Sequence, residues 1–405
     1  MQWKEYIKVG MIMRDELEIN SNKKTTGNRI LTIFYYKDIG PQHLYKDVGS
    51  IPLGLAKYCN WDSTFAYVNW GKVVKNREYE RFVSLVSIKL YWNPLFSAAL
   101  FLWNHVNEYE ILNVYHLIKR NLLLTTVAKI RNPSIKIYVK TDSGRKSVPQ
   151  MRKGRIYNIC VQLLAHLHLL PDLCTVETKA YVNRLKRTPL YKGRVRYLPN
   201  GFWRDESIPE NLECQKEKII LTVGRLGTPE KNTELLLDSF AAIPAAQRME
   251  WNLVLVGSYT PEIFQKAQRL ITRDKTLKGR IQFTGNISEK KILNQYYLKA
   301  MIFCFPSRWE SFGLVLVEAI HHGCFPIVTD CCDAFYDILD QGKYGDIIPN
   351  EDALALTKAL ERAMSDEQAT VRQGMAAKQY VDQHFDWEKI IYRLQEYLND
   401  VDRKK

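Results

Sequence analysis

The sequence predicts an α/β protein made of two Rossmann-like domains. Short apolar runs alternate with longer amphipathic segments along most of the chain, a pattern typical of parallel strands joined by helices. A length of 405 residues is sufficient for two domains. An irregular, acidic stretch that contains Pro209 separates two such series. We therefore expect an N-terminal extension, a first domain, a linker, a second domain and a C-terminal helix, at residues 1–28, 29–202, 203–217, 218–384 and 385–405.

The first domain follows a polar extension that has almost no apolar residues between Asn20 and Asn28. Its apolar runs predict buried strands at 29–36, 65–70, 82–90, 111–116, 135–142, 173–177 and 194–198. Helical spacing of apolar residues predicts helices at 51–58, 94–104, 152–170 and 178–187. The helix at 152–170 begins with three cations, so we expect it either to pack inside the domain or to lie on a membrane interface.

The second domain repeats the same alternation. Strands are expected at 218–223, 252–256, 281–283, 302–305 and 325–328, and helices from about 232, at 312–322, at 352–364 and at 386–398. In open α/β domains of this kind, ligands bind at the carboxyl ends of the strands. We therefore look for functional residues in the loops that follow each strand.

The composition fits a soluble globular protein, with 46% apolar and 25% charged residues. The longest apolar candidate, Leu95–Trp103, is far too short to span a membrane. The first residues lack the long apolar core and small-residue cleavage site of a signal peptide. We expect a cytoplasmic protein.

The eight cysteines contain no Cys-x-x-Cys pair, and we expect reduced thiols. A zinc site formed by Cys331, Cys332, His321 and His322 is the alternative, although their spacing fits no usual zinc site. No Asp-x-Asp motif follows a predicted strand, so we expect a protein that needs no metal ion.

The net charge of +14 is unevenly distributed, because residues 1–200 carry +18 and residues 201–405 carry −4. A basic first half indicates an anionic partner, for which nucleic acid, an anionic membrane surface and a diphosphate-linked acceptor all qualify. The alternative is a solvated basic face. The sequence has no helix-turn-helix, RNA-binding or zinc signature, and we expect no nucleic-acid partner.

Residues 302–330 carry the clearest functional pattern. We place Glu310 in the loop after a strand and Glu318 two turns into the following helix, with both carboxylates directed at one pocket. Between them, the backbone N–H groups of Ser311, Phe312, Gly313 and Leu314 lie at a positive helix end, and Gly313 allows close approach of a ligand. Amides that bind anions beside carboxylates that accept from hydroxyls suit a sugar diphosphate. The alternative is an ordinary loop and helix with two unrelated glutamates.

PSRWESFGLVLVEA followed by GCFPIVTD resembles the Glu-x7-Glu signature of retaining nucleotide-sugar glycosyltransferases of the GT-B fold, the group 1 or family 4 type. The resemblance is rich in motifs over 218–345, weak over 29–201 and absent before 29. It implies two Rossmann-like domains that face each other across a cleft, with a final helix that crosses back to the first domain. It also implies that Glu310 contacts the hydroxyls of the donor sugar and that Glu318 binds the ribose.

The segment GRLGTPEKN supplies two cations, Arg225 and Lys231, at the carboxyl end of a strand. They would offset the charge of a departing diphosphate, or they are part of a charged surface turn. In the family that this chain resembles, the same GR and KN pair binds the diphosphate. Gly257 closes the next strand and is a further candidate for donor binding. Asn286, in a Gly-Asn-Ile turn, stands where the family's nucleobase rests on the backbone.

The first domain offers weaker candidates. Gly49 precedes the expected helix at 51–58 and would let a phosphate approach the backbone, or it is a simple turn. His116 ends a strand and resembles the family's histidine that faces the donor sugar, or it is a core or capping histidine. Lys140 and Asp142 end another strand, where they would contact donor or acceptor, or form a structural ion pair.

These observations predict a retaining hexosyl- or N-acetylhexosaminyltransferase. Its donor would be a UDP-sugar in preference to a GDP-sugar, and its acceptor a lipid-linked glycan in bacterial surface polysaccharide synthesis. We expect a peripheral location on the inner face of the plasma membrane. The alternatives are a non-catalytic GT-B subunit that stabilises a partner transferase, and a sugar-nucleotide epimerase, which shares the fold.

Overall fold

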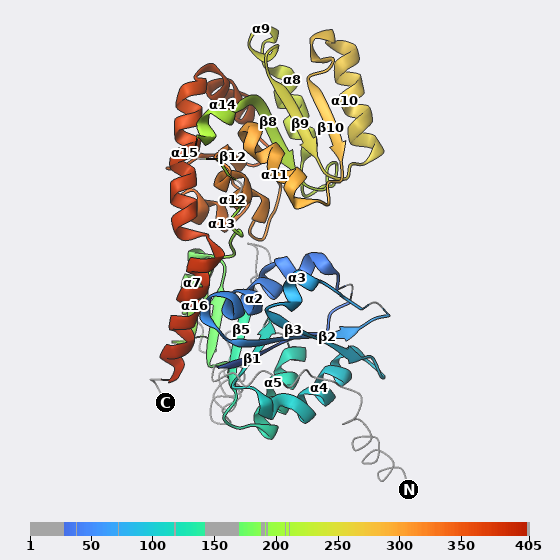
Figure 1. The fold of residues 1–405 in the computed structure, drawn as a ribbon. Helices are drawn as coiled ribbons and strands as arrows, with labels where there is room; N and C mark the ends of the chain where they lie inside the picture. Colours follow the sequence, from blue (N-terminus) through green and yellow to red (C-terminus); the bar gives the residue numbers. More distant parts are fainter. Residues whose placement is uncertain are drawn as a thin grey trace.

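The computed structural model describes residues 28–402 apart from 38, 72, 117–118, 142–169, 188–190, 192, 207 and 210. It consists of two α/β domains, one above the other in Figure 1. Each domain contains one sheet whose strand pairs are all parallel, with helices on both faces. The predicted fold class of two Rossmann-like domains is confirmed. Asp142 and nearly all of the helix expected at 152–170 lie outside the described residues.

The first domain is built on a seven-stranded sheet with the order β3-β2-β1-β4-β5-β6-β7. The strands are β1 (Arg29–Phe34), β2 (Asp62–Asn69), β3 (Val83–Lys89), β4 (Ile111–Tyr115), β5 (Lys136–Thr141), β6 (Leu173–Val176) and β7 (Val195–Tyr197). The helices are α2 (Asp47–Cys59), α3 (Arg77–Glu80), α4 (Pro94–His105), α5 (Lys119–Arg131) and α7 (Lys179–Leu185), with short 3-10 helices η1 (Pro41–Tyr45) and η2 (Val106–Glu108).

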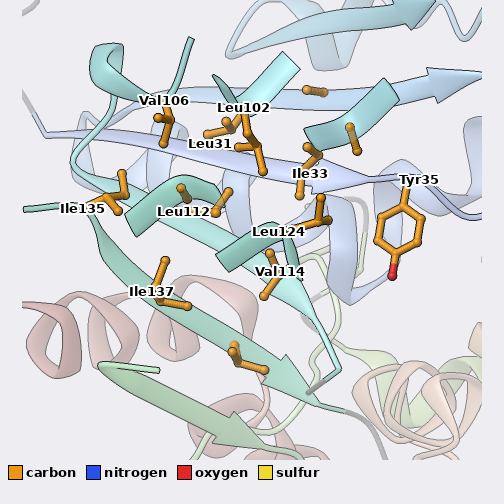
Figure 2. Close-up of a cluster of buried hydrophobic side chains, with 14 of the residues drawn as sticks. Leu31, Ile33, Tyr35, Leu102, Val106, Leu112, Val114, Leu124, Ile135 and Ile137 are labelled. Atoms are coloured by element: carbon orange, nitrogen blue, oxygen red, sulfur yellow. The ribbon is translucent and has the colours of Figure 1, made fainter. Parts of the chain in front are cut away.

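Apolar side chains cover both faces of this sheet. On one face, Leu31, Leu112 and Ile137 pack against helices α4 and α5 (Figure 2). On the other face, Ile30 and Phe65 belong to a core that includes residues of α2. Successive residues of a strand point to opposite faces, so neighbours such as Ile30 and Leu31 enter different cores. Burial on both faces explains why an inner strand such as β4 is a nearly continuous apolar run, whereas the edge strand β3 includes exposed residues.

The second domain has a six-stranded sheet with the order β10-β9-β8-β11-β12-β13. The strands are β8 (Glu217–Val223), β9 (Asn252–Val256), β10 (Ile281–Gly285), β11 (Ala300–Phe305), β12 (Phe325–Thr329) and β13 (Asp346–Ile348). The helices are α8 (Thr233–Ala242), α9 (Ala245–Arg248), α10 (Pro261–Arg273), α11 (Lys290–Lys299), α12 (Leu314–His321), α13 (Asp333–Ile338), α14 (Ala353–Ser365) and α15 (Glu367–His384). The 3-10 helices are η4 (Leu212–Gln215), which lies before β8, and η5 (Lys275–Leu277).

The last helix, α16 (Trp387–Asp402), leaves the second domain and runs along the first, beside α2 (Figure 1). Its residues Ile390, Ile391 and Leu394 are fully buried in the core of the first domain. Gly54 of α2 makes this packing possible, because a Cβ at that position would lie 2.3 Å from the Ile391 side chain. The two domains are therefore joined both by the linker and by this returning helix.

Helix α2 differs from the expectation at its beginning. It starts at Asp47, four residues earlier than predicted, and Pro52 lies inside it. The missing N–H of proline usually marks the first turn of a helix, which is why the sequence favours a start at Ile51. Gly49 is consequently a buried helical residue and not part of a phosphate-binding turn. A Cβ on Gly49 would lie 2.3 Å from the Leu44 carbonyl oxygen, so glycine is needed for the packing of η1 on α2.

Candidate active site

A pocket of about 680 Å³ opens between the two domains, at the carboxyl ends of both sheets. This volume lies within the range of small-molecule sites. The candidate residues of the second domain line it with one exception, Glu318: the lining includes Arg225, Lys231, Gly257, Asn286, Glu310, Ser311, Phe312, Gly313 and Leu314. The first domain contributes Lys46, Asp47, Glu177 and Asn200.

Lys231 and Glu310 form an ion pair inside this pocket. Both side chains are largely buried, with 17% and 14% of their surfaces exposed. The Ser307 hydroxyl donates to the same carboxylate oxygen of Glu310 at 2.8 Å, and the Lys231 ammonium lies 4.9 Å from the centre of the Phe305 ring. The ammonium of Lys231 is thus partly desolvated and lies where β8 and β11 end. Its present partner is the Glu310 carboxylate, and an anionic ligand could take the place of that carboxylate beside the ammonium.

Helix α12 begins at the pocket, and Gly313 is its N-cap. Gly313 has a φ of 86°, a conformation that side-chain-bearing residues adopt only with strain. A Cβ there would lie 2.9 Å from the Phe335 ring, so both the backbone and the packing require glycine. The first N–H groups of the helix have no carbonyl partner within it, and they present a positive end to the pocket.

Arg225 lies at the pocket rim and donates to the Glu230 carboxylate at 2.6 Å, with 71% of its side chain exposed. Burial opposes ionisation of Glu230, but hydrogen bonds from its own backbone N–H and Thr228, together with Arg225 and Lys231, hold its pKa below the ordinary value. Arg225 is therefore a long, exposed cation on a surface pair, and such pairs hold their partners weakly. It can turn toward an anion in the pocket at little cost.

Glu318 lies in the second turn of α12, outside the residues that line the pocket. Its carboxylate pairs with the ammonium of Lys290 at 2.6 Å and accepts from the Tyr297 hydroxyl at 3.2 Å. Lys290 begins α11, directly after the loop in which Asn286 lines the pocket. The structure thus brings Glu318 near the edge of the pocket and gives it two present partners.

The loop after β9 owes its shape to a contact between two glycines. Gly257 has a φ of 132°, and a Cβ on it would lie 1.8 Å from the carbonyl oxygen of Gly224. Its N–H donates to the Gly285 carbonyl at 3.0 Å, which ties the ends of β9 and β10 together. This close approach leaves open backbone on the floor of the pocket, where Gly224 and Gly257 both line it.

The first-domain wall contains residues that the sequence did not single out as site residues. Glu177 follows β6 and Asn200 follows β7, and the Asn200 amide donates to the Glu177 carboxylate at 2.5 Å. Both residues are more than nine-tenths buried. The signal that could have identified Asn200 is the LPNGF turn at the end of its strand, because a polar residue there faces the ligand edge of the sheet.

The remaining first-domain candidates lie elsewhere. Lys140 is fully buried and donates to the Leu198 carbonyl at 2.6 Å, so it holds two strand ends together instead of contacting a ligand. His116 follows β4 with a φ of 63°, and its ring packs edge-on against Tyr36 and Tyr115. It is at the same edge of the sheet as the pocket but does not line it.

The alternative zinc site is not formed. His321 pairs with Asp382 and His322 with Asp205, while the Cys332 thiol donates to the Ser311 carbonyl at 3.0 Å. Within the described ranges, no group of three or more His, Cys, Asp or Glu side chains could hold a metal ion, and all cysteines there are free thiols. Helices long and apolar enough to cross a membrane are likewise absent from the part of the chain that the structure describes.

Residues 204–380 match the family described as glycosyl transferases group 1. Among curated proteins, the chain is 27% identical over 210 residues to the phosphatidyl-myo-inositol mannosyltransferase of Mycobacterium leprae, covering 50% of this chain and 53% of that protein. It is 26% identical over 174 residues to an α-1,4-N-acetyl-D-galactosaminyltransferase of Campylobacter jejuni that acts on a diphospho-undecaprenol-linked glycan, covering 43% and 46%. The chain thus spans about half the length of these relatives.

Solved structures resemble almost the whole chain. The structure of Anabaena Alr3699/HepE in complex with UDP matches with a TM-score of 0.65 and 16% identity, covering 92% of this chain and 100% of that one. A glycosyltransferase from Rickettsia africae matches with a TM-score of 0.70 and 15% identity, covering 94% and 100%. At these identities the likeness establishes the fold, which is that of the GT-B glycosyltransferases.

Proposed function

Since this chain belongs to the GT-B glycosyltransferases, with its group 1 domain at residues 204–380, we propose that it transfers a sugar from a nucleotide-sugar donor to an acceptor hydroxyl with retention of the anomeric configuration. The observation that carries the proposal is the ion pair of Lys231 and Glu310 beside the amino end of α12. One small pocket thereby offers a cation and helix amides for a diphosphate, and a carboxylate for sugar hydroxyls.

In this proposal the diphosphate of the donor binds against Lys231, Arg225 and the first amides of α12. The bond between the anomeric carbon and the phosphate oxygen breaks, and the nucleoside diphosphate leaves with the bonding electrons. The acceptor oxygen forms the new bond to that carbon, and its proton passes to the departing phosphate. The two cations and the helix end stabilise the charge that develops on the leaving group.

Glu310 and Glu318 bind the two sugars of the donor. Once the diphosphate shares the charge of Lys231, Glu310 is free to accept hydrogen bonds from hydroxyls of the transferred sugar. Glu318 binds the ribose hydroxyls after exchanging its pairing with the half-exposed ammonium of Lys290. The protein cations neutralise the diphosphate, and the proposal includes no metal ion. Asn286 and the glycines at the ends of β9 and β10 leave room for the base on backbone atoms.

We propose a UDP-sugar as donor and a lipid-linked glycan of bacterial surface polysaccharide synthesis as acceptor. The proposed donor is supported by the Anabaena protein of similar fold, whose structure was solved in complex with UDP. Support for the acceptor is the Campylobacter relative, whose name specifies an undecaprenol-linked glycan. The transferred sugar would be a hexose or an N-acetylhexosamine.

We propose that the enzyme meets its lipid-linked acceptor at the cytoplasmic face of an anionic membrane. The first half of the chain carries the positive charge, and its helix α4 is flanked and lined by exposed aromatic rings. Trp92 is 85% exposed, and Phe96 and Trp103 are about half exposed at 45% and 48%. Exposed aromatic residues on a basic domain are typical of interfacial binding.

The test is product analysis. The protein is incubated with UDP-hexoses and UDP-N-acetylhexosamines and a set of octyl glycosides, and the anomeric proton of any product is observed by NMR. The proposal expects release of UDP that depends on the octyl glycoside, and a product with the anomeric configuration of the donor. Inversion would refute retention. UDP binding without transfer to any glycoside would favour the non-catalytic subunit, and acceptor-independent conversion of the donor sugar would favour an epimerase.

A further inference from the structure

The wall that the first domain presents to the pocket differs in charge from the opposite wall. It carries the carboxylates of Asp47 and Glu177 against the cation of Lys46, whereas the second domain contributes the cations of Arg225 and Lys231 against the carboxylate of Glu310. A diphosphate therefore binds preferentially to the second-domain side. The first-domain wall is then available to a ligand group that donates hydrogen bonds to its carboxylates and carries no negative charge.

Glu177 and Asn200 are the most buried polar residues of that wall, with exposed fractions of 2% and 5%. The Asn200 amide nitrogen donates to one Glu177 oxygen at 2.5 Å, which fixes the amide so that its oxygen is turned away from the carboxylate. That amide oxygen has no hydrogen-bond donor among the described residues, although its residue lines the pocket. A buried acceptor of this kind costs stability unless a ligand or water donates to it.

The segment that follows Glu177 is fixed against the second domain. Two residues after Glu177, the backbone N–H of Lys179 donates to the Asp337 carboxylate of the second domain at 2.8 Å, and Arg184 pairs with Asp333 at 3.0 Å. Glu177 and Glu310 line the same pocket, Glu177 from the first domain and Glu310 from the second. Glu177 therefore faces the region in which Glu310 would hold the transferred sugar.

We propose that Glu177 and Asn200 form an acceptor subsite that binds the hydroxyls of a neutral terminal sugar and excludes an anionic one. This inference rests on the proposed function and adds the class of acceptor. The Asn200 oxygen and the Glu177 carboxylate accept from neighbouring hydroxyls, which matches the donors that a hexose or N-acetylhexosamine presents. A uronic acid or a phosphorylated sugar would bring a second negative charge to a desolvated carboxylate and would be repelled.

The experiment compares neutral and anionic sugars on the UDP-loaded protein. Octyl mannoside, octyl N-acetylgalactosaminide and octyl glucuronide are titrated into the wild type and Glu177→Gln in saturating UDP, and Kd is measured by calorimetry. For the wild type we expect each neutral glycoside to bind at least about tenfold more tightly than the glucuronide, the scale of one charge-assisted hydrogen bond. In Glu177→Gln that ratio should fall to within about twofold of unity, with the Kd for UDP unchanged.

A second variant separates recognition from folding. Asn200→Ser removes the amide but keeps the carboxylate, so it should weaken the neutral glycosides at least about fivefold while the glucuronide is still disfavoured. This variant tests the inference even if Glu177→Gln does not fold. An unchanged ratio in a folded Glu177→Gln, or wild-type affinity in Asn200→Ser, would overturn the subsite, as would a wild type that binds UDP but prefers the glucuronide. A wild type that binds no UDP would refute the proposed function instead.

Discussion

Lys231 and Glu310 lie 79 residues apart in the sequence and pair at the ends of two neighbouring parallel strands, β8 and β11. Each residue belongs to a loop that follows its strand. A parallel sheet brings such loops to one edge, so the pairing follows from the strand order of the second domain. The same edge receives the amino end of α12, and the pocket is built where these features meet.

Glu310→Ala removes the carboxylate that we assign to the transferred sugar. We expect turnover to fall by at least about tenfold, because the variant lacks one interaction that stabilises the transition state. Glu250→Ala is the matched control, because Glu250 is an exposed glutamate that pairs with a surface lysine away from the pocket. The measurement is kcat for UDP release in the presence of acceptor. Wild-type turnover in Glu310→Ala would contradict the role of Glu310.

Gly313→Ala tests the backbone at the start of α12. A positive φ alone costs a side chain about 1 kcal/mol, and the clash with Phe335 adds to that cost. Gly279→Ala is the control, since Gly279 has a similar φ of +80° and nothing within 4 Å of its would-be Cβ. Urea unfolding should show a larger decrease in stability for Gly313→Ala than for Gly279→Ala. Equal decreases would mean that packing at this helix end is not tight.

His322 makes stability depend on pH. It is 2% exposed, and burial first, followed by the neighbouring His321, lowers its pKa to about 4 even though Asp205 is close. An unfolded histidine has a pKa of about 6.5, so below that pH the unfolded state takes up a proton that the folded state resists. The contribution is complete above about pH 6.5 and is lost as the pH falls toward 4.

Between pH 7 and pH 5 the decrease in stability due to His322 should be about 2 kcal/mol. Urea unfolding of the wild type and His322→Gln at both pH values measures it. The variant should be less stable than the wild type at pH 7, because it lacks the hydrogen bond between His322 Nδ1 and the Glu318 carbonyl. Between pH 7 and pH 5, however, its free energy of unfolding should fall less than that of the wild type. Parallel decreases in the two proteins would show that His322 titrates alike in the folded and unfolded states.

Most strands of both sheets were predictable, because the inner strands are buried on both faces and are nearly continuous apolar runs. The short edge strand β13 was not predicted, since its three residues include an aspartate and form no such run. The position of Glu310 in a loop and of Glu318 within a helix was also predictable, from the turn residues before Gly313. The role of Gly49 was not, because a glycine before a helical pattern looks the same whether it meets a phosphate or the Leu44 carbonyl.

The first-domain wall could not be derived from the sequence. Glu177 and Asn200 meet because β6 and β7 are neighbours in the sheet, and nothing in the local pattern of either residue specifies that register. The structural role of Lys140 could not be predicted from the sequence for a related reason. The end of its strand is predictable, but the burial of its side chain against the Leu198 carbonyl depends on a segment 58 residues away.

The most direct measurement of the central claim is calorimetric titration of UDP, in buffer with EDTA, into the wild type, Lys231→Met and Lys266→Met. Lys266 is the matched control, since it lies on the surface of α10 and pairs there with Asp238 of α8. We predict metal-independent binding by the wild type and by Lys266→Met, and a Kd at least about tenfold higher for Lys231→Met, because this variant lacks a charge-assisted hydrogen bond to the diphosphate. Equal UDP affinity in Lys231→Met and the wild type would contradict the assignment of this pocket to the donor.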